Sequence, residues 1–215
     1  MIIFEFISIF VMLPLAASFI DMPFYLILSP MLVAFVYSVW WLFFCQKMRW
    51  KYLLRSESLV IDKKQLKIIS LRFIVCVILL TGLVLQLYPD KFLNFPLQYP
   101  LLFLGFIFLY PILSVLPQEL LYRTFFFERY QTIFRKPKIM ILASAITFSF
   151  LHIIYHNYDS VLLTLIGGYF FSQSYRATRS LLIVCIEHSL YGVLVFTLGF
   201  GGFFIRGLKE VGLVL

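Results

Sequence analysis

Residues 101–123 read LLFLGFIFLYPILSVLPQELLYR, and this stretch decides how the rest of the chain is interpreted. Its apolar run, which ends at Leu116, is followed by Gln118, Glu119 and Arg123. A carboxylate and a guanidinium are costly to bury in so apolar a segment, so their presence needs a reason. On a helix Glu119 and Arg123 share one face and can pair, whereas Gln118 points about 100° away. The alternative is a helix end whose charges reach into the lipid headgroups.

The composition predicts a polytopic membrane protein. Of the 215 residues, 62% are hydrophobic and 13% are charged, whereas a soluble domain is about half apolar and a quarter charged. We therefore expect an all-α fold, a single transmembrane bundle of about seven to eight helices over residues 1–215. The net charge of +8 comes from basic residues in the loops, which indicates contact with membrane lipid and no nucleic acid.

Seven apolar runs are expected to cross the membrane, at residues 2–20, 24–44, 73–88, 101–130, 139–156, 161–173 and 181–198. The first run carries Glu5 and no preceding basic segment, which favours a retained helix over a signal peptide. A last segment to residue 215 is expected to lie at the interface or to form part of an eighth span. Basic residues gather in alternate connections, so these loops and the amino terminus are expected in the cytoplasm.

Three ionisable residues on three different runs lie at similar predicted depths. Counted from the cytoplasmic ends, Glu119 lies about 16 Å deep, His152 about 20 Å and His188 about 11 Å. Buried ionisable groups usually face a bundle interior or a wet cavity and need partners. The sequence therefore predicts one site shared by three helices. Glu187 lies on another face, without an evident charge partner, and is expected to make a hydrogen bond between helices.

Metal binding is a further alternative for the histidines. His156 follows His152 one helical turn later, a spacing that can bind a metal. Glu119, His152 and His188 could also form a zinc site with an open position for water. No His-Glu-x-x-His pattern is present, and His152 can equally be a histidine that is hydrogen-bonded between helices. We expect no metal and no other cofactor.

Three motifs follow one another in the chain: Gln118-Glu119-x-x-x-Arg123, Phe148-x-x-x-His152 and His188-x-x-x-Gly192. Their order resembles the CPBP family of intramembrane proteases, also called the type II CAAX prenyl endopeptidase or Abi family. That family has Glu-Glu-x-x-x-Arg, then Phe-x-x-x-His, then His-x-x-x-Asn. The resemblance covers about residues 100–200.

The resemblance implies a membrane endopeptidase of the glutamate type, with a cavity open towards the cytoplasm and a peptide or protein substrate. In this chemistry a Glu and a His hold and deprotonate a water. By position, Glu119 and His152 would act on the water, and His188 would donate to the oxyanion. Arg123 would fix the motif helix. Related proteins of this kind imply a multi-pass protein of a bacterial or archaeal cell membrane.

Two departures from the family pattern leave alternatives open. Gln118 stands at the usual position of the base, so Glu119 takes that role, or His152 does with Gln118 positioning the water, or the protein is inactive. Gly192 removes one oxyanion donor, which Tyr191 or Ser189 could replace. A catalytically impaired member that binds a peptide or lipid is therefore one alternative function. A small transporter that uses the buried charges as a relay is another.

Overall fold

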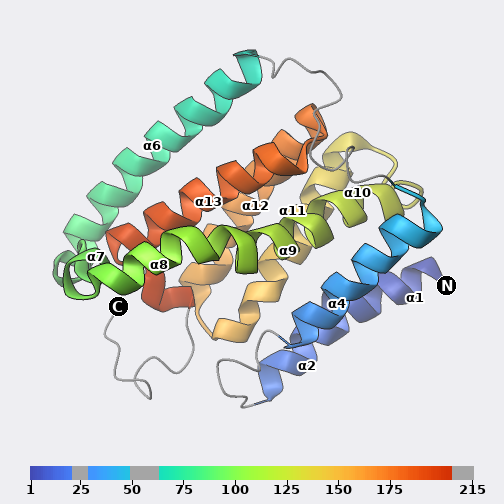
Figure 1. Cartoon of the computed structure of the whole chain (residues 1–215), viewed down its shortest axis with the longest axis horizontal. Coiled ribbons are helices and arrows are strands. Elements are labelled where there is room, and N and C mark those ends of the chain that lie inside the picture. Colours follow the sequence, from blue (N-terminus) through green and yellow to red (C-terminus); the bar gives the residue numbers. More distant parts are fainter. Residues whose placement is uncertain (21–28, 49–62, 205–215) are drawn as a thin grey trace.

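The computed structural model describes residues 1–20, 29–48 and 63–204, and these residues form a bundle of helices joined by short connections (Figure 1). None of the described residues forms a strand. The predicted all-α fold is confirmed. In chain order the α-helices are α1 (Ile2–Ile7), α2 (Leu13–Phe19), α4 (Ser29–Trp40), α6 (Lys63–Leu87), α7 (Asn94–Gln98), α8 (Pro100–Tyr110), α9 (Leu116–Glu119), α10 (Phe126–Arg129), α11 (Pro137–Leu151), α12 (Tyr158–Thr178) and α13 (Leu181–Leu198).

Several of these helices continue into one another and are long and apolar enough to cross a membrane. Within the described ranges five such helices are present: Ile2–Phe19, Lys63–Leu87, Pro100–Arg129, Pro137–Tyr155 and Leu181–Leu198. A shorter apolar helix covers Leu32–Cys45. The protein is therefore an integral membrane protein. The start of the predicted second span and the predicted segment after residue 204 lie outside the described residues.

Two predicted spans are longer than the apolar pattern indicated. α6 begins at Lys63 rather than at residue 73, because its first turns contain neither Pro nor Gly and can extend the apolar helix. Arg72 therefore lies in a helix and not in a loop; residues 49–62 of that predicted loop lie outside the described part. α12 has 21 residues and begins after Asn157, whose side chain accepts hydrogen bonds from two backbone N–H groups.

Prolines explain two local changes of helical geometry. Proline lacks an N–H donor, and its ring clashes with the carbonyl four residues earlier. Pro14 follows a π-helical turn at Ser8–Met12, and Pro117 follows one at Pro111–Val115. In both cases the carbonyl four residues before the proline lies within the π-helical turn, which takes up the clash. A further π-helical turn, Leu120–Phe125, contains Arg123.

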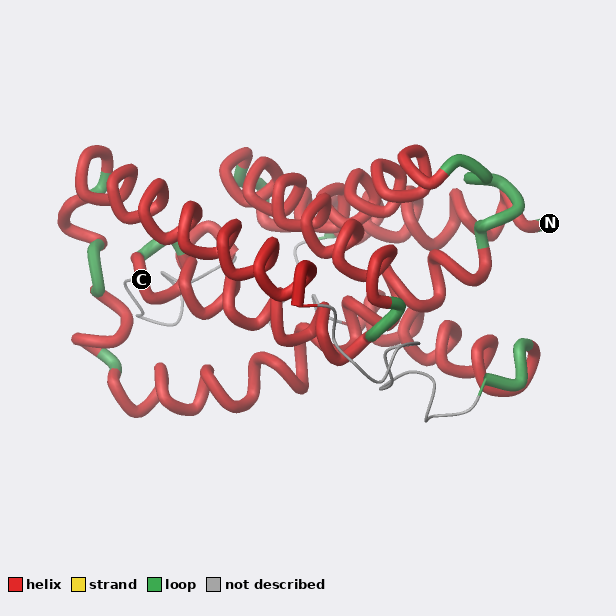
Figure 2. The backbone as a smooth tube through the Cα atoms, turned by 90° about the horizontal axis from the view of Figure 1, so that it is seen from above, coloured by secondary structure: helices red, strands yellow, loops and turns green. Residues whose placement is uncertain are grey.

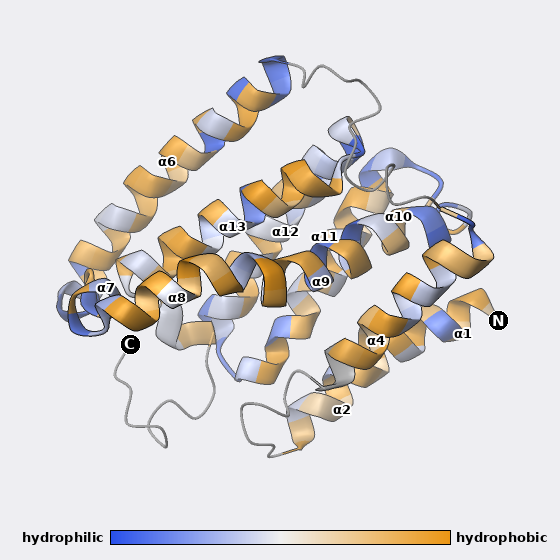
Figure 3. Cartoon of the chain, in the orientation of Figure 1, coloured by the Kyte–Doolittle hydropathy of each residue, from blue (hydrophilic) through white to orange (hydrophobic). Residues whose placement is uncertain are grey.

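The long helix Pro100–Arg129, which holds α8, α9 and α10, packs beside α13 and contacts α11 towards its carboxyl end (Figure 1). α12 packs against both α11 and α13, and α6 packs on α13. Figure 2 shows the same bundle from above. Hydrophilic residues gather near the helix ends, whereas α6 and α8 are apolar along most of their length (Figure 3). The motif-bearing residues therefore lie between helices α9, α11, α12 and α13.

Candidate active site

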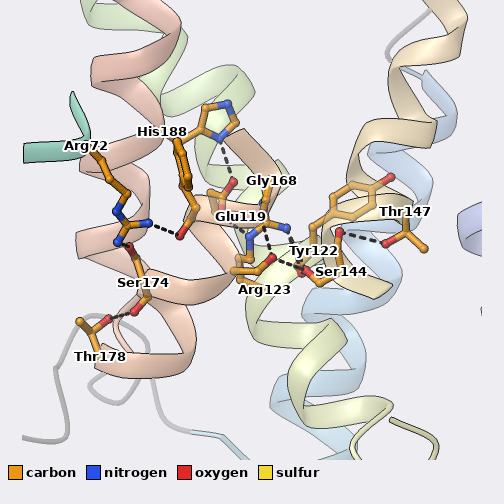
Figure 4. A network of polar contacts seen from close by, with 12 residues as sticks. Arg72, Glu119, Tyr122, Arg123, Ser144, Thr147, Gly168, Ser174, Thr178 and His188 are labelled. Atoms are coloured by element: carbon orange, nitrogen blue, oxygen red, sulfur yellow. Dashed lines mark hydrogen bonds and ion pairs between the residues drawn. The ribbon is translucent and has the colours of Figure 1, made fainter. Parts of the chain in front are cut away.

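Glu119 is the centre of a buried polar network (Figure 4). It ends α9 and has no exposed surface. Its Oε1 accepts a hydrogen bond from Nδ1 of His188 at 2.8 Å. Its Oε2 lies 3.1 Å from Nε of Arg123, an ion pair whose angle is not that of a hydrogen bond. The Glu119 carboxylate thus contacts both Arg123 and His188, which lie on different helices.

Arg123 fixes the π-helical turn of the motif helix to α11. It is fully buried, and its Nη1 donates to Oγ of Ser144 at 3.0 Å and to the Tyr122 carbonyl at 3.2 Å. Ser144 also donates to that carbonyl at 2.7 Å and accepts from Ser172 of α12 at 3.0 Å. The guanidinium lies over the ring of Phe148, 4.8 Å from its centroid. These charges point into the bundle, so the alternative of charges in the headgroups is wrong.

His188 is held on three sides within α13. Its Nε2 lies 3.2 Å from the hydroxyl of Tyr110, at the end of α8. Its ring stacks on Phe171 of α12 at a centroid distance of 4.6 Å and meets the Phe148 ring edge-on at 5.5 Å. Because both ring nitrogens have partners and one face stacks on Phe171, the imidazole has one orientation.

His152 lies beside the same phenylalanine. Its Nδ1 donates to the Phe148 carbonyl at 2.8 Å, and its ring centroid lies 4.9 Å from that of Phe148. Since Nδ1 carries the proton, Nε2 is the nitrogen that can accept one when the ring is neutral. Phe148 therefore lies against both His152 and His188, and against Arg123 as well. The three predicted ionisable residues occupy one region of the bundle.

His156 does not belong to this region. The helix ends before it, and His156 adopts a left-handed backbone conformation with φ of 53°. Its Nε2 donates to the carbonyl of Ser18 in the amino-terminal helix at 2.8 Å. His152 and His156 therefore do not share a helical face as the spacing predicted, because the regular helix stops at Leu151.

Gln118 is buried but is not part of the charged network. Its Nε2 donates to Oγ of Ser114 at 2.8 Å, one turn earlier on the same helix. Its Oε1 is buried without a hydrogen-bond partner. A buried acceptor left without a donor is costly, so this oxygen is a candidate for contact with a water or a ligand.

Gly192 faces Tyr110 rather than open space. A Cβ atom at Gly192 would collide with the ring and the hydroxyl of Tyr110. The two residues that could have supplied a donor in its place are turned elsewhere: Ser189 donates to the Cys185 carbonyl at 2.7 Å, and Tyr191 packs its ring edge-on against Phe73 at 5.5 Å. No pattern in the sequence pointed to Tyr110, which is one of 13 tyrosines and lies eight residues before Gln118.

Glu187 has a charge partner that the sequence did not predict. Nη1 of Arg72 in α6 lies 4.0 Å from Oε1 of Glu187. The same guanidinium reaches Gln173 at 3.4 Å and Ser174 at 3.5 Å, both on α12 (Figure 4). The prediction of an unpaired Glu187 was wrong because Arg72 was assigned to a loop, whereas α6 carries it to the level of α13.

The expectation that the site holds no metal stays a prediction. The described residues contain no group of three or more His, Cys, Asp or Glu side chains placed to hold a metal ion. Both oxygens of Glu119 are taken, one by His188 and the other by Arg123. A guanidinium in that place would repel a cation.

The segment that contains these residues matches a known protein family. Residues 100–194 match the family model described as type II CAAX prenyl endopeptidase, Rce1-like. A search of curated proteins found no match, and a search of solved structures found none either. The matched residues include Glu119, Arg123, His152 and His188, which the bundle brings together. Through this segment the chain is similar to the type II CAAX prenyl endopeptidases, a family of intramembrane proteases.

Proposed function

We propose that the protein is an endopeptidase that hydrolyses a peptide bond inside the membrane with an activated water. The observation that carries this proposal is the 2.8 Å contact between Glu119 and His188, deep in the bundle and beside His152. The family match supports a membrane endopeptidase. A carboxylate and two imidazoles are groups that can activate a water for such hydrolysis. A site that excludes bulk water strengthens their effect.

We assign the proton transfers to His152. Its Nε2 would accept a proton from the water as the water oxygen attacks the carbonyl carbon of the peptide. The same nitrogen would then return that proton to the departing amine, so that the histidine ends in its starting state. Gln118, at the motif position next to Glu119, would accept a hydrogen bond from the water through its free Oε1. The amide cannot take a proton, so it can only orient the water.

Glu119 acts through His188 in this proposal. The two oxygens of Glu119 face His188 and Arg123, and the side chain has no exposed surface, so we assign the carboxylate to orienting His188 rather than to binding the water. With a proton on each ring nitrogen, His188 would donate from Nδ1 to Glu119 and from Nε2 to the Tyr110 hydroxyl, on the side where the oxyanion would form. Arg123 limits the negative charge of the carboxylate and holds it in place.

Activity can be tested on two probes that share one sequence. The first is an internally quenched peptide that ends in a farnesylated CAAX sequence, and the second is the same peptide without the farnesyl group. We expect Glu119→Gln, His152→Ala and His188→Ala each to lower kcat/KM at least about 100-fold. His156→Ala is the matched control, because His156 binds the Ser18 carbonyl outside the site. Full activity in all three site variants would contradict the proposal.

A second candidate function is that of a family member that binds a peptide or lipid without cleaving it. The observation that favours it is Gln118, a buried amide where the family has a carboxylate. A positioned general base contributes about 10²- to 10⁴-fold in rate. Gln118→Glu should therefore create or raise peptidase activity by that factor, whereas Gln118→Met should not. Efficient cleavage by the wild-type protein would exclude this second function.

We also propose that the amino terminus lies in the cytoplasm and that the site opens towards that side. Glu5 near the amino terminus binds Arg129 next to the basic connection 129–138. That connection and the one at 176–179 are rich in Arg and Lys, which is typical of cytoplasmic loops. Cys45 is exposed, and in a variant without Cys76 and Cys185 a membrane-impermeant maleimide should label it only after cell lysis. Labelling of intact cells would reverse the orientation.

A further inference from the structure

Tyr110 is the one hydroxyl that the described residues place against Nε2 of His188. It is the last residue of α8, directly before the π-helical turn Pro111–Val115. Its ring stacks on Phe106 at a centroid distance of 4.7 Å and meets the His188 ring edge-on at 6.1 Å. These contacts fix the ring, so the hydroxyl is held 3.2 Å from the imidazole nitrogen.

Gly192 makes the room that this ring occupies. Gly192 lies four residues after His188 on α13, so the two positions face the same way. Any residue with a Cβ atom at position 192 would collide with the ring and hydroxyl of Tyr110. Tyr110 can therefore occupy this place only because residue 192 has no side chain. The hydroxyl stands where a polar side chain from position 192 would begin.

We infer that the Tyr110 hydroxyl is a catalytic hydrogen-bond donor that stabilises the oxyanion, and that His188 acts through this hydroxyl. The hydroxyl oxygen accepts from Nε2–H of protonated His188, which leaves its own O–H free to donate. That O–H would point at the substrate oxygen that becomes negative when water adds to the peptide carbonyl. The hydrogen bond from a protonated imidazole polarises the hydroxyl and strengthens this donation. Tyr110 makes no covalent bond and keeps its proton throughout.

This assignment rests on the proposed peptidase function and explains how a chain with Gly192 retains an oxyanion donor beside His188. It predicts that Tyr110→Phe lowers kcat about 100- to 1000-fold with little change in KM, because the oxyanion forms only in the transition state. Tyr88→Phe is the matched control, since Tyr88 packs on Phe200 and Phe203 away from His188. Thermal unfolding in detergent checks that both variants fold equally well.

The pairing of the two positions gives a sharper test. Gly192→Asn alone should be inactive or unfolded because the side chain meets Tyr110. Adding Tyr110→Ala removes the ring, and the double variant should recover at least tenfold in kcat over Tyr110→Ala alone, because the asparagine amide becomes the donor. No recovery in a folded double variant would contradict the assignment.

All tyrosine variants are measured with both probes in the wild-type and in the Gln118→Glu background. Unchanged kcat for Tyr110→Phe in a background that cleaves would overturn the role of Tyr110 and leave the peptidase function standing. If neither background cleaves either probe, the peptidase function fails and the oxyanion role fails with it. The two failures are thus separate results of one experiment.

Discussion

Glu119 and Arg123 are charged side chains without exposed surface, and they lie within 3.1 Å of each other. Removing two charges from water costs several kcal/mol per ion, and mutual attraction offsets this only with good geometry and further hydrogen bonds. His188 supplies such a bond to the carboxylate, and Ser144 supplies one to the guanidinium. An apolar pair of equal volume would be as stable. The ion pair therefore serves to hold the Glu119 carboxylate in one position rather than to stabilise the fold.

Arg123→Met tests this view. The change leaves Glu119 as a buried charge without its guanidinium, so the free energy of unfolding should fall by about 3–5 kcal/mol. Denaturant unfolding of the detergent-solubilised protein measures the loss. The double variant Glu119→Leu and Arg123→Met removes both charges and should lose much less. A double variant as unstable as the sum of its singles would show that the two side chains act independently.

At the scale of elements, the helix Pro100–Arg129 departs from the regular 3.6-residue spacing of an α-helix. It contains two π-helical turns, Pro111–Val115 and Leu120–Phe125. Each such turn holds more residues than an α-helical turn and shifts the face of everything that follows. Glu119 lies between the two turns, so an ideal 3.6-residue count could not show which way it faces. The prolines in the sequence signalled the first turn, and no residue type signals the second.

The close packing of α11 on α12 also positions the histidines. A Cβ atom at Gly168 of α12 would lie 2.9 Å from Cδ1 of Phe148 and 3.3 Å from the Ala145 backbone. Phe148 in turn contacts both His152 and His188. A methyl group at Gly168 would therefore displace Phe148 and, through it, the two histidines.

Gly168→Ala should lower the free energy of unfolding by about 1–3 kcal/mol, since overpacking forces the backbone or the Phe148 ring to move. Peptidase activity should fall with it, because Phe148 carries the shift to both histidines. Gly82→Ala in α6 is the control: no atom lies within 4 Å of its Cβ position, and the higher helix propensity of Ala should leave stability equal or slightly raised. Equal stability of the two variants would contradict this prediction and show that the α11–α12 contact can accommodate an additional methyl group.

At the scale of the whole molecule, Glu5 connects the amino-terminal helix to the helix that carries the site. Its carboxylate accepts two hydrogen bonds from Arg129, at 2.8 and 2.7 Å, one from Tyr130 at 2.9 Å and one from Tyr37 at 3.0 Å. Three helical segments far apart in the sequence thus meet at one carboxylate. Arg129 also lies over the Trp41 ring, 5.1 Å from its centroid.

Glu5→Gln should lower the free energy of unfolding by about 1–3 kcal/mol, because the two-pronged bond from Arg129 loses its charge. The loss should shrink at high salt, since both side chains are partly exposed and their attraction is screened. Thermal unfolding at low and high ionic strength measures this. Asp90→Asn, an exposed carboxylate in the connection after α6, should leave stability unchanged. Equal loss in both variants would contradict the structural role of Glu5.

The sequence by itself determined the class of the protein and the residues of its motifs. A chain with 62% hydrophobic residues, arranged in apolar runs of about 20, is expected to form helices in a membrane, and polar residues in such runs are rare enough to be noticed. Glu119, Arg123, His152 and His188 could be named for that reason. Their approximate depths followed from the fixed rise of a helix.

Only the tertiary structure decided which of these residues touch. Helix spacing relates residues of one helix, whereas the contacts of Glu119 with His188, Arg72 with Glu187, and Glu5 with Arg129 join different helices. Rotation about each helix axis, π-helical turns and close packing set those contacts, and no local pattern encodes them. Tyr110 is the clearest case: its place beside His188 depends on the absence of a side chain at Gly192, on another helix.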